Sequence, residues 1–245
     1  MPGVRPYDAT MVESRQWQTH EAPGIALSLP FSGRWLATNS PSRRVPSHGT
    51  NLMGERYAID FTGVDDRHRT SDHRDWRTFF STEPADRFYA FGQPILAPSE
   101  GTIVLAHDGE TDHVARRSQL ALVPYALGQR SRLRQGVSAI ADNHVIIALR
   151  DGSAFVALVH LRRDSIRVAI GERVVVGQQV AECGNSGNST QPHVHVQAMD
   201  SLDLPVARGL PMYFRPFREW RRGAQQFLVR ESGVPEEGSV VEPLS

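Results

Sequence analysis

Residues 184–197 read GNSGNSTQPHVHVQ and join a turn rich in Gly, Asn and Ser to the start of a strand. Side chains alternate between the two faces of a strand, so His193 and His195 are predicted to point the same way, with Gln197 beyond them. Two imidazoles side by side pack poorly in a core but suit a metal ion. Two solvent-facing histidines on an edge strand are the alternative interpretation, and the turn and the proline before the motif favour the metal.

The segments around this motif carry strand signals and few long helical ones. They are rich in Val, Ile, Ala and Phe, and Gly, Pro, Asn or Asp separates most of them. They comprise YAIDF (57–61), PILAPSEGTIVLA (94–106), NHVIIALRDGSAFVALVHL (143–161), ERVVVGQQVAECG (172–184) and PHVHVQAM (192–199). Within the third segment, Asp151-Gly152 predicts the type I′ turn of a hairpin. The sequence therefore predicts a compact, mainly β fold.

Two insertions and two flanking segments accompany this β core. Residues 66–91 and 111–140 interrupt the strands, are predicted to contain short helices, and have the length of walls or lids of a site. Residues 1–44 are expected to be an N-terminal extension packed on a domain formed by residues 45–205. Residues 206–245 form a C-terminal segment that is expected to be disordered from about residue 231, where it becomes polar and rich in Pro and Gly.

Composition excludes several kinds of chemistry. Among the 245 residues there are 27 basic and 27 acidic side chains, so no net charge draws the protein onto nucleic acid or a membrane surface. All basic residues are arginine, and the absence of lysine excludes Schiff-base catalysis, a Walker-type phosphate loop and a lipoyl acceptor site. The single cysteine, Cys183, excludes an intrachain disulfide framework and a cysteine-rich zinc site. Any metal must therefore be held by histidines and carboxylates.

The cellular location is predicted from two absences. The start, MPGVRPYDATMVESRQW, lacks a basic stretch followed by an apolar one, which argues against a secretory signal. No window approaches the roughly 18 uninterrupted apolar residues of a membrane span. These features predict a cytoplasmic protein without a membrane span. A misassigned start or non-classical export would instead place the protein outside the cell or at the cell wall.

Two further sites carry polar residues in apolar surroundings. In YAIDF, Asp60 lies in a strand so apolar that a carboxylate is costly unless a metal or an arginine such as Arg56 pairs with it. His48 lies twelve residues upstream, across a loop long enough to return it to Asp60. His160 ends the apolar strand FVALVH, where a structural histidine is the alternative to a catalytic one.

Taken together these residues indicate a catalytic zinc site. Such sites commonly use three protein ligands, and His48, Asp60 and His195 form a set of two histidines and one carboxylate. His160 and His193 remain beside the metal without binding it, which suits general acid–base work. Zinc lowers the pKa of a bound water from about 15.7 to about 7. The reaction class predicted is hydrolysis of an amide or peptide bond.

The same motifs resemble the lysostaphin-type zinc metallopeptidases, a family of peptidoglycan endopeptidases. The similarity extends over roughly residues 45–200. SHGTNLMGERYAIDF resembles the first zinc motif of the family, FGQPILAPSEGTIV its next hairpin, DNHVIIALRDGSAFVALVHL the strands that lead to its active-site histidine, and ERVVVGQQVAECGNSGNSTQPHVHVQ its closing motif. The resemblance implies an antiparallel β-sandwich or barrel-like fold with a groove that holds Zn²⁺, and a peptidoglycan peptide or other small peptide as substrate.

Residue by residue, the resemblance implies that His48, Asp60 and His195 bind zinc and that His160 and His193 are catalytic. The loop between His48 and Asp60 is longer than in most members, so His68 or His73 is an alternative to His48. Gln197 stands where an acidic residue often follows the closing motif, which would alter the support of the metal ligands.

Three other functions share individual features with this sequence. A non-catalytic metal-binding or regulatory module with the same fold fits the lack of an export signal. A carrier domain shares the V-x-x-G-x-x-V pattern of ERVVVGQQVAECG, but the absence of lysine excludes it. A cysteine hydrolase would use Cys183, whose position after an apolar run is more typical of a small buried residue.

Overall fold

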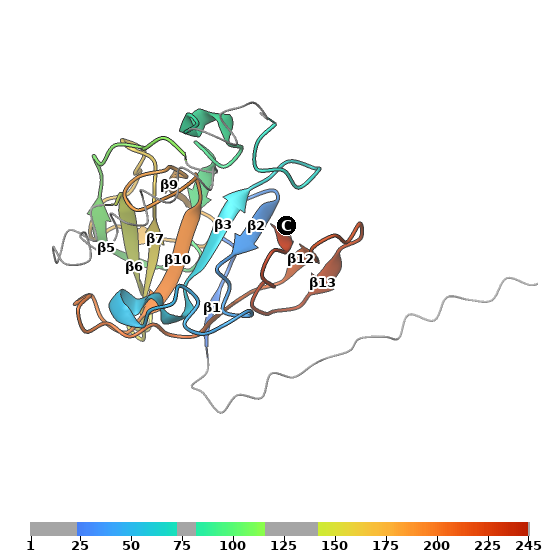
Figure 1. Cartoon of the computed structure of the whole chain (residues 1–245). Coiled ribbons are helices and arrows are strands. Elements are labelled where there is room, and N and C mark those ends of the chain that lie inside the picture. Colours follow the sequence, from blue (N-terminus) through green and yellow to red (C-terminus); the bar gives the residue numbers. More distant parts are fainter. Residues whose placement is uncertain (1–23, 73–81, 116–141, 245) are drawn as a thin grey trace, which may run out of the picture.

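In the computed structural model, residues 24–72, 82–115 and 142–244 are described, and they form a mainly β chain with two short helices (Figure 1). The strands are β1 (Ile25–Leu27), β2 (Trp35–Thr38), β3 (Ile59–Gly63), β4 (Pro94–Leu96), β5 (Gly101–His107), β6 (His144–Leu149), β7 (Phe155–Val159), β8 (Arg173–Val174), β9 (Gln179–Glu182), β10 (Val194–Met199), β11 (Met212–Phe214), β12 (Phe217–Trp220), β13 (Leu228–Arg230) and β14 (Val240–Pro243). The 3-10 helices are η1 (Leu52–Tyr57) and η2 (Ala85–Arg87).

Ten of the strands form one sheet in the order β13-β12-β14-β2-β3-β10-β7-β6-β5-β8, and every pairing in it is antiparallel. The pairs β1–β11, which is parallel, and β4–β9 form two smaller sheets. The predicted mainly β, antiparallel fold is confirmed. Closure into a barrel is not found in the described residues, because β13 and β8 stand at the two ends of the order and each pairs with one neighbour.

The centre of the sheet sets the register of the residues that matter for chemistry. β10 lies between β3 and β7 (Figure 1), with His195 opposite Asp60 on one side and Val159 on the other. β6 and β7 form the predicted hairpin, whose turn contains Gly152 in the left-handed region at φ 70°. This register brings Asp60 of β3, His195 of β10, the start of β6 and the end of β7 to one region of the sheet.

Aromatic residues from distant parts of the chain build the core. Phe61 of β3 packs edge-on against Phe31, at 5.0 Å between ring centroids, and against Phe214 of β11, at 5.4 Å. Phe31 also stacks on Trp35 of β2. Strands before residue 45 and after residue 205 therefore share a core and a sheet with the strands between them, although the predicted division into segments at these residues stays a prediction.

The expected disorder from about residue 231 is wrong, because β14 lies inside the sheet between β12 and β2. Val240 and Val241 are buried there. The buried Glu219 accepts hydrogen bonds from Arg230, from the backbone N–H of Glu236 and from Ser239. The carboxylates of Glu236 and Glu242 pair with Arg230 and Arg218. The average polarity of the segment gave no sign that Val240 and Val241 are buried, or that its acidic residues pair with other parts of the chain.

The described residues include two short helices and parts of both insertions. Helix η1 lies in the loop between His48 and Asp60, and η2 is the short helix expected within residues 66–91. The helical content expected for residues 111–140 lies outside the described residues from 116 onward. In the described parts of the chain, no helix is both long and apolar enough to cross a membrane.

Replacing Val241 by Ala tests the placement of β14. The side chain is fully buried, so Val241→Ala is expected to lower the free energy of unfolding by roughly 2 kcal/mol, from lost apolar burial and the cavity left behind. Val229→Ala, in the edge strand β13 where the side chain is 52% exposed, is the matched control and is expected to change it by less than about 0.5 kcal/mol. Urea denaturation measures both, and equal values would contradict the buried strand.

Candidate metal centre

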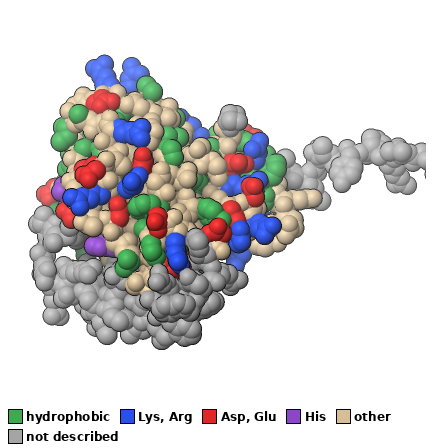
Figure 2. All heavy atoms as spheres, turned by 90° about the horizontal axis from the view of Figure 1, so that it is seen from above, with side chains coloured by type: hydrophobic (Ala, Val, Ile, Leu, Met, Phe, Trp, Pro, Cys, Tyr) green, Lys and Arg blue, Asp and Glu red, His purple; other side chains and the backbone are tan. Residues whose placement is uncertain are grey.

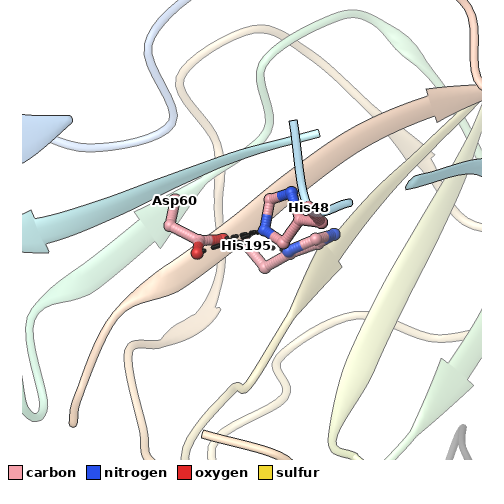
Figure 3. A group of neighbouring side chains, drawn as sticks. All are labelled: His48, Asp60 and His195. Carbon is pink, nitrogen blue, oxygen red and sulfur yellow. Dashed lines mark hydrogen bonds and ion pairs between the residues drawn. The ribbon is translucent and has the colours of Figure 1, made fainter. Parts of the chain in front are cut away.

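Three donor side chains from separate parts of the chain meet at one point. His48 comes from the loop before η1, Asp60 from β3 and His195 from β10, and one ligand atom of each lies within 4.8 Å of the others (Figure 3). Nε2 of His48 is 3.2 Å from both carboxylate oxygens of Asp60, and Nδ1 of His195 is 2.9 Å from Oδ1. Figure 3 shows both imidazoles turned toward the carboxylate.

This donor set passes a simple test of fit to zinc. Ligands bound tetrahedrally at about 2.0–2.1 Å from zinc are roughly 3.3 Å apart. The distances from the His48 and His195 nitrogens to Asp60 are close to that separation. Two neutral imidazoles and a carboxylate are also a frequent set in catalytic zinc sites, which leave one position open. The three residues fit the ion that the sequence predicted.

Helix η1 explains how His48 returns to Asp60 over twelve residues. The chain turns back through Met53 and Gly54, both in the left-handed region at φ 55° and 79°. The backbone N–H of Ser47 donates to the carbonyl of Arg56 across the base of the loop. The longer loop thus brings Nε2 of His48 to 3.2 Å from the Asp60 carboxylate.

The structure tests two of the alternatives: His68 in place of His48, and Arg56 in place of a metal beside Asp60. His68 lies against Trp220, with 5.9 Å between ring centroids, while His73 lies outside the described residues. Arg56, the expected alternative partner of Asp60, donates instead to Asn51. Asp60 pairs with imidazoles and receives a hydrogen bond of 2.7 Å from the side chain of Asn39.

Burial and charge act against each other at the centre. Burial alone raises the pKa of Asp60, but His193, His195 and His48 outweigh it and hold that pKa well below the usual value. Burial also lowers the pKa of His195, yet the hydrogen bond and charge of Asp60 raise it to about 9. The site therefore keeps a buried carboxylate ionised, and this carboxylate attracts positive charge.

Gln197 fixes the orientation of His195. Its amide nitrogen donates to the carbonyl of Met53 at 2.8 Å, so its Oε1 faces His195 and accepts from Nε2 at 2.9 Å. With the proton of His195 thus assigned to Nε2, Nδ1 is the nitrogen directed at Asp60. The glutamine that replaces the common acidic residue still supplies the oxygen that such a ligand needs behind it.

His160 and His193 lie beside the cluster, as the sequence predicted, and their rings are 4.6 Å apart. Nδ1 of His193 donates to the carbonyl of Gln191 at 2.8 Å, and Nδ1 of His160 lies 3.1 Å from the carbonyl of Ser186. A carbonyl can only accept, so both rings carry a proton on Nδ1 and have a lone pair on Nε2. Nε2 of His193 lies 3.7 Å from Asp60, and burial lowers the pKa of this imidazole to about 4.

Sequence reasoning missed several residues that support these five. Asn39 lies in the segment taken for an extension, and Asp142 opens the segment DNHVIIALRDGSAFVALVHL, in which only the strands and His160 were assigned a role. Asp142 is buried and its Oδ2 lies 3.3 Å from Nδ1 of His160. His144 is buried in β6 and stacks on His107. The sequence shows only an acidic residue close to the start of a strand, which does not reveal its burial or its partner.

Comparison with known proteins identifies the family of the central segment. The model for Peptidase family M23 matches residues 85–204, and this segment belongs to that family. The resemblance drawn from the sequence motifs is thereby confirmed. The match includes His160, His193 and His195, whereas His48 and Asp60 lie before it. A search of curated proteins finds no match.

Solved structures similar to this chain include the catalytic domain of the antimicrobial peptidase lysostaphin from Staphylococcus simulans. It is 18% identical with a TM-score of 0.37, over 73% of this chain and 88% of that one. The protein LytU is 18% identical with a TM-score of 0.36, over 80% and 87%. A zinc containing peptidase from Vibrio cholerae is 17% identical with a TM-score of 0.30, over 58% and 46%.

The expected groove across the site stays a prediction. A cavity of about 320 Å³ in the described residues is lined by Arg162–Arg167 and Glu182, and none of the five predicted site residues lines it. The surface seen in Figure 2 intersperses arginine and acidic side chains. Pairs such as Arg162–Glu182 at 2.6 Å fit this picture of balanced charge.

Iodoacetamide is expected to leave the folded protein unmodified. Cys183 is fully buried, and burial raises the pKa of its thiol well above the usual value, so little reactive thiolate forms. Intact mass spectrometry of the native protein should show no adduct, and the urea-unfolded protein should show one. Rapid alkylation of the native protein with loss of activity would instead favour a cysteine hydrolase with Cys183 as its nucleophile.

Proposed function

We propose that this chain is a zinc-dependent endopeptidase that hydrolyses peptide cross-links of peptidoglycan or a related peptide containing Gly or D-Ala. His48, Asp60 and His195 hold the metal, and His160 and His193 are the catalytic residues. The observation that carries the proposal is the lone pair on Nε2 of each catalytic histidine, beside a fitting zinc donor set. Membership of peptidase family M23 supports the reaction class.

The hydrogen bonds at Nδ1 of His160 and His193 suggest a role for each ring. Bound zinc would polarise the scissile carbonyl and acidify the attacking water. One neutral histidine of the pair His160 and His193 accepts a proton from that water and returns it to the leaving amine. The other can stabilise negative charge on the carbonyl oxygen only when its Nε2 is protonated, because the proton on its Nδ1 is already donated to a backbone carbonyl. Their anchored Nδ1 atoms hold both rings in place, so little ordering is needed during the reaction.

The substrate class rests on the resemblance to peptidoglycan endopeptidases and on the name of one similar structure, an antimicrobial peptidase. A balanced charge fits a peptide substrate better than a nucleic acid. Because peptidoglycan lies outside the cytoplasmic membrane, this function requires the chain to reach the cell wall. Fractionation of the cells that make the protein would show whether it reaches the wall.

Metal analysis combined with hydrolysis tests the proposal. The purified protein is expected to contain about one zinc per chain and to release peptide fragments from purified peptidoglycan. Chelation should abolish this release, and added zinc should restore it. Bound zinc without any hydrolysis of peptidoglycan or of glycine-rich peptides would instead favour a non-catalytic metal-binding module. A chain that binds no zinc would contradict both functions.

A further inference from the structure

A carboxylate stands behind one of the two proposed catalytic histidines. Asp142 lies two residues before β6 and His160 directly follows β7, so the hairpin register brings the two residues to the same end of the sheet. Oδ2 of Asp142 lies 3.3 Å from Nδ1 of His160. Both side chains are 9% exposed. Asp142 is not part of the zinc donor set, so its carboxylate is available to the histidine.

The turn that precedes the HVH motif holds this pair together. The carbonyl of Ser186 lies 3.1 Å from Nδ1 of His160, and the backbone N–H of Asn188 donates to Oδ1 of Asp142 at 3.1 Å. Between them, Gly187 adopts φ 62°, and a side chain there would overlap the Asp142 carboxylate. Glycine at this position therefore lets the turn close over Asp142 and leaves Oδ2 directed at His160.

The backbone of His160 is itself unusual. It adopts φ 63°, in the left-handed region that non-glycine residues rarely occupy. Such conformations persist where the surroundings over-determine them, and they are enriched at functional sites. The backbone N–H of Gly184 donates to the His160 carbonyl at 3.0 Å, so the same turn also fixes the main chain of this residue.

We propose that Asp142 is a positioning residue that acts through His160, a role that rests on the proposed peptidase function. As an acceptor it holds the proton of His160 on Nδ1, which leaves the lone pair of Nε2 free for the proton of the attacking water. When Nε2 takes that proton, the carboxylate stabilises the imidazolium by charge. Hydrogen-bonded carboxylates do this for histidine bases on unrelated folds.

The state of Asp142 supports this role. Burial alone would raise the pKa of Asp142, but the hydrogen bond and charge of His160 and the N–H of Asn188 lower it. The group is therefore ionised at neutral pH and can only accept hydrogen bonds. The carbonyl of Ser186 accepts at the same nitrogen but carries no charge, so it cannot provide the electrostatic part.

The substitution Asp142→Asn separates positioning from a structural role. The amide oxygen can keep the hydrogen bond from Asn188, which retains the turn, while the amide nitrogen faces Nδ1 of His160 as a donor. Because the Ser186 carbonyl still accepts at Nδ1, we expect the amide nitrogen to compete with it and to shift the His160 tautomer population from Nδ1–H toward Nε2–H. The 15N chemical shifts of the zinc-supplied full chain report this change, with His160 assigned by comparison with His160→Gln.

The kinetic expectation follows from the same change. kcat on peptidoglycan fragments should fall by about 10²-fold or more with KM little changed, since the lost base acts in the reaction and not in binding. Asp151→Asn is the matched control. Asp151 is an exposed residue in the turn between β6 and β7 that accepts from Ser153, and its replacement should leave the tautomer and kcat unchanged.

The outcomes distinguish this proposal from the function on which it rests. A wild-type His160 with its proton on Nε2 would overturn the positioning role without any variant, even if Asp142→Asn failed to fold. An unchanged kcat in folded Asp142→Asn, with wild-type hydrolysis intact, would also overturn it and leave the peptidase standing. Absence of hydrolysis in the zinc-loaded wild type would refute the peptidase, while the tautomer measurement would still show whether Asp142 orients His160.

Discussion

Replacing His195 by Ala is expected to remove zinc and hydrolysis together. Nδ1 of His195 is one of three donor atoms, and its loss leaves only His48 and Asp60 at the centre. Loss of a residue that merely supports a ligand typically weakens metal affinity by about 10- to 100-fold, so loss of a ligand should exceed that. Elemental analysis of His195→Ala after dialysis should find zinc near zero, and peptidoglycan hydrolysis should fall to background.

The matched control for this substitution is His113→Ala. His113 is exposed, and its backbone rather than its imidazole pairs with Asn185. This variant should keep the wild-type zinc content and rate, which shows that the effect of His195→Ala belongs to the site. A His195→Ala protein that still carries one zinc per chain would rule out the proposed ligand set.

The strands were accessible to sequence analysis because alternation and glycine-bounded apolar runs are local signals. The pairing partners were not. β14 lies between β12 and β2, and no local pattern in GSVVEP indicates that Val241 pairs with Trp35, which lies some 200 positions earlier. A short strand whose acids are satisfied by residues elsewhere looks the same in sequence as a solvated tail.

In the site, too, residues marked by a local pattern were predictable, whereas residues defined by distant partners were not. His193 and His195 follow from the period of one strand, and Asp60 from the cost of a carboxylate in an apolar one. The length of the loop showed only that His48 could reach Asp60, because the turn at Met53 and Gly54 that returns it depends on contacts with β10. Asp142 and Asn39 gain their meaning from partners far along the chain, and no spacing rule reports those.

Replacing His160 by Ala is expected to slow hydrolysis while zinc remains bound. His160 is bonded through Nδ1 to Ser186 and Asp142, and it is absent from the donor set, so its loss leaves the three ligands in place. Removing a general base or acid costs about 10²- to 10⁴-fold in rate, and we expect kcat to fall within that range. Measurement of kcat together with zinc content distinguishes this result from that of His195→Ala.

A change in rate without a change in metal is what separates a catalytic residue from a ligand. Imidazole added to the His160→Ala protein should restore part of the rate, because the lost group is an imidazole and the pocket that it leaves is lined by Ser186, Asp142 and His193. The same addition should not help His195→Ala, which lacks zinc. A zinc-loaded His160→Ala protein with wild-type kcat would show that His160 takes no part in proton transfer and would leave His193 as the only histidine base among the five residues.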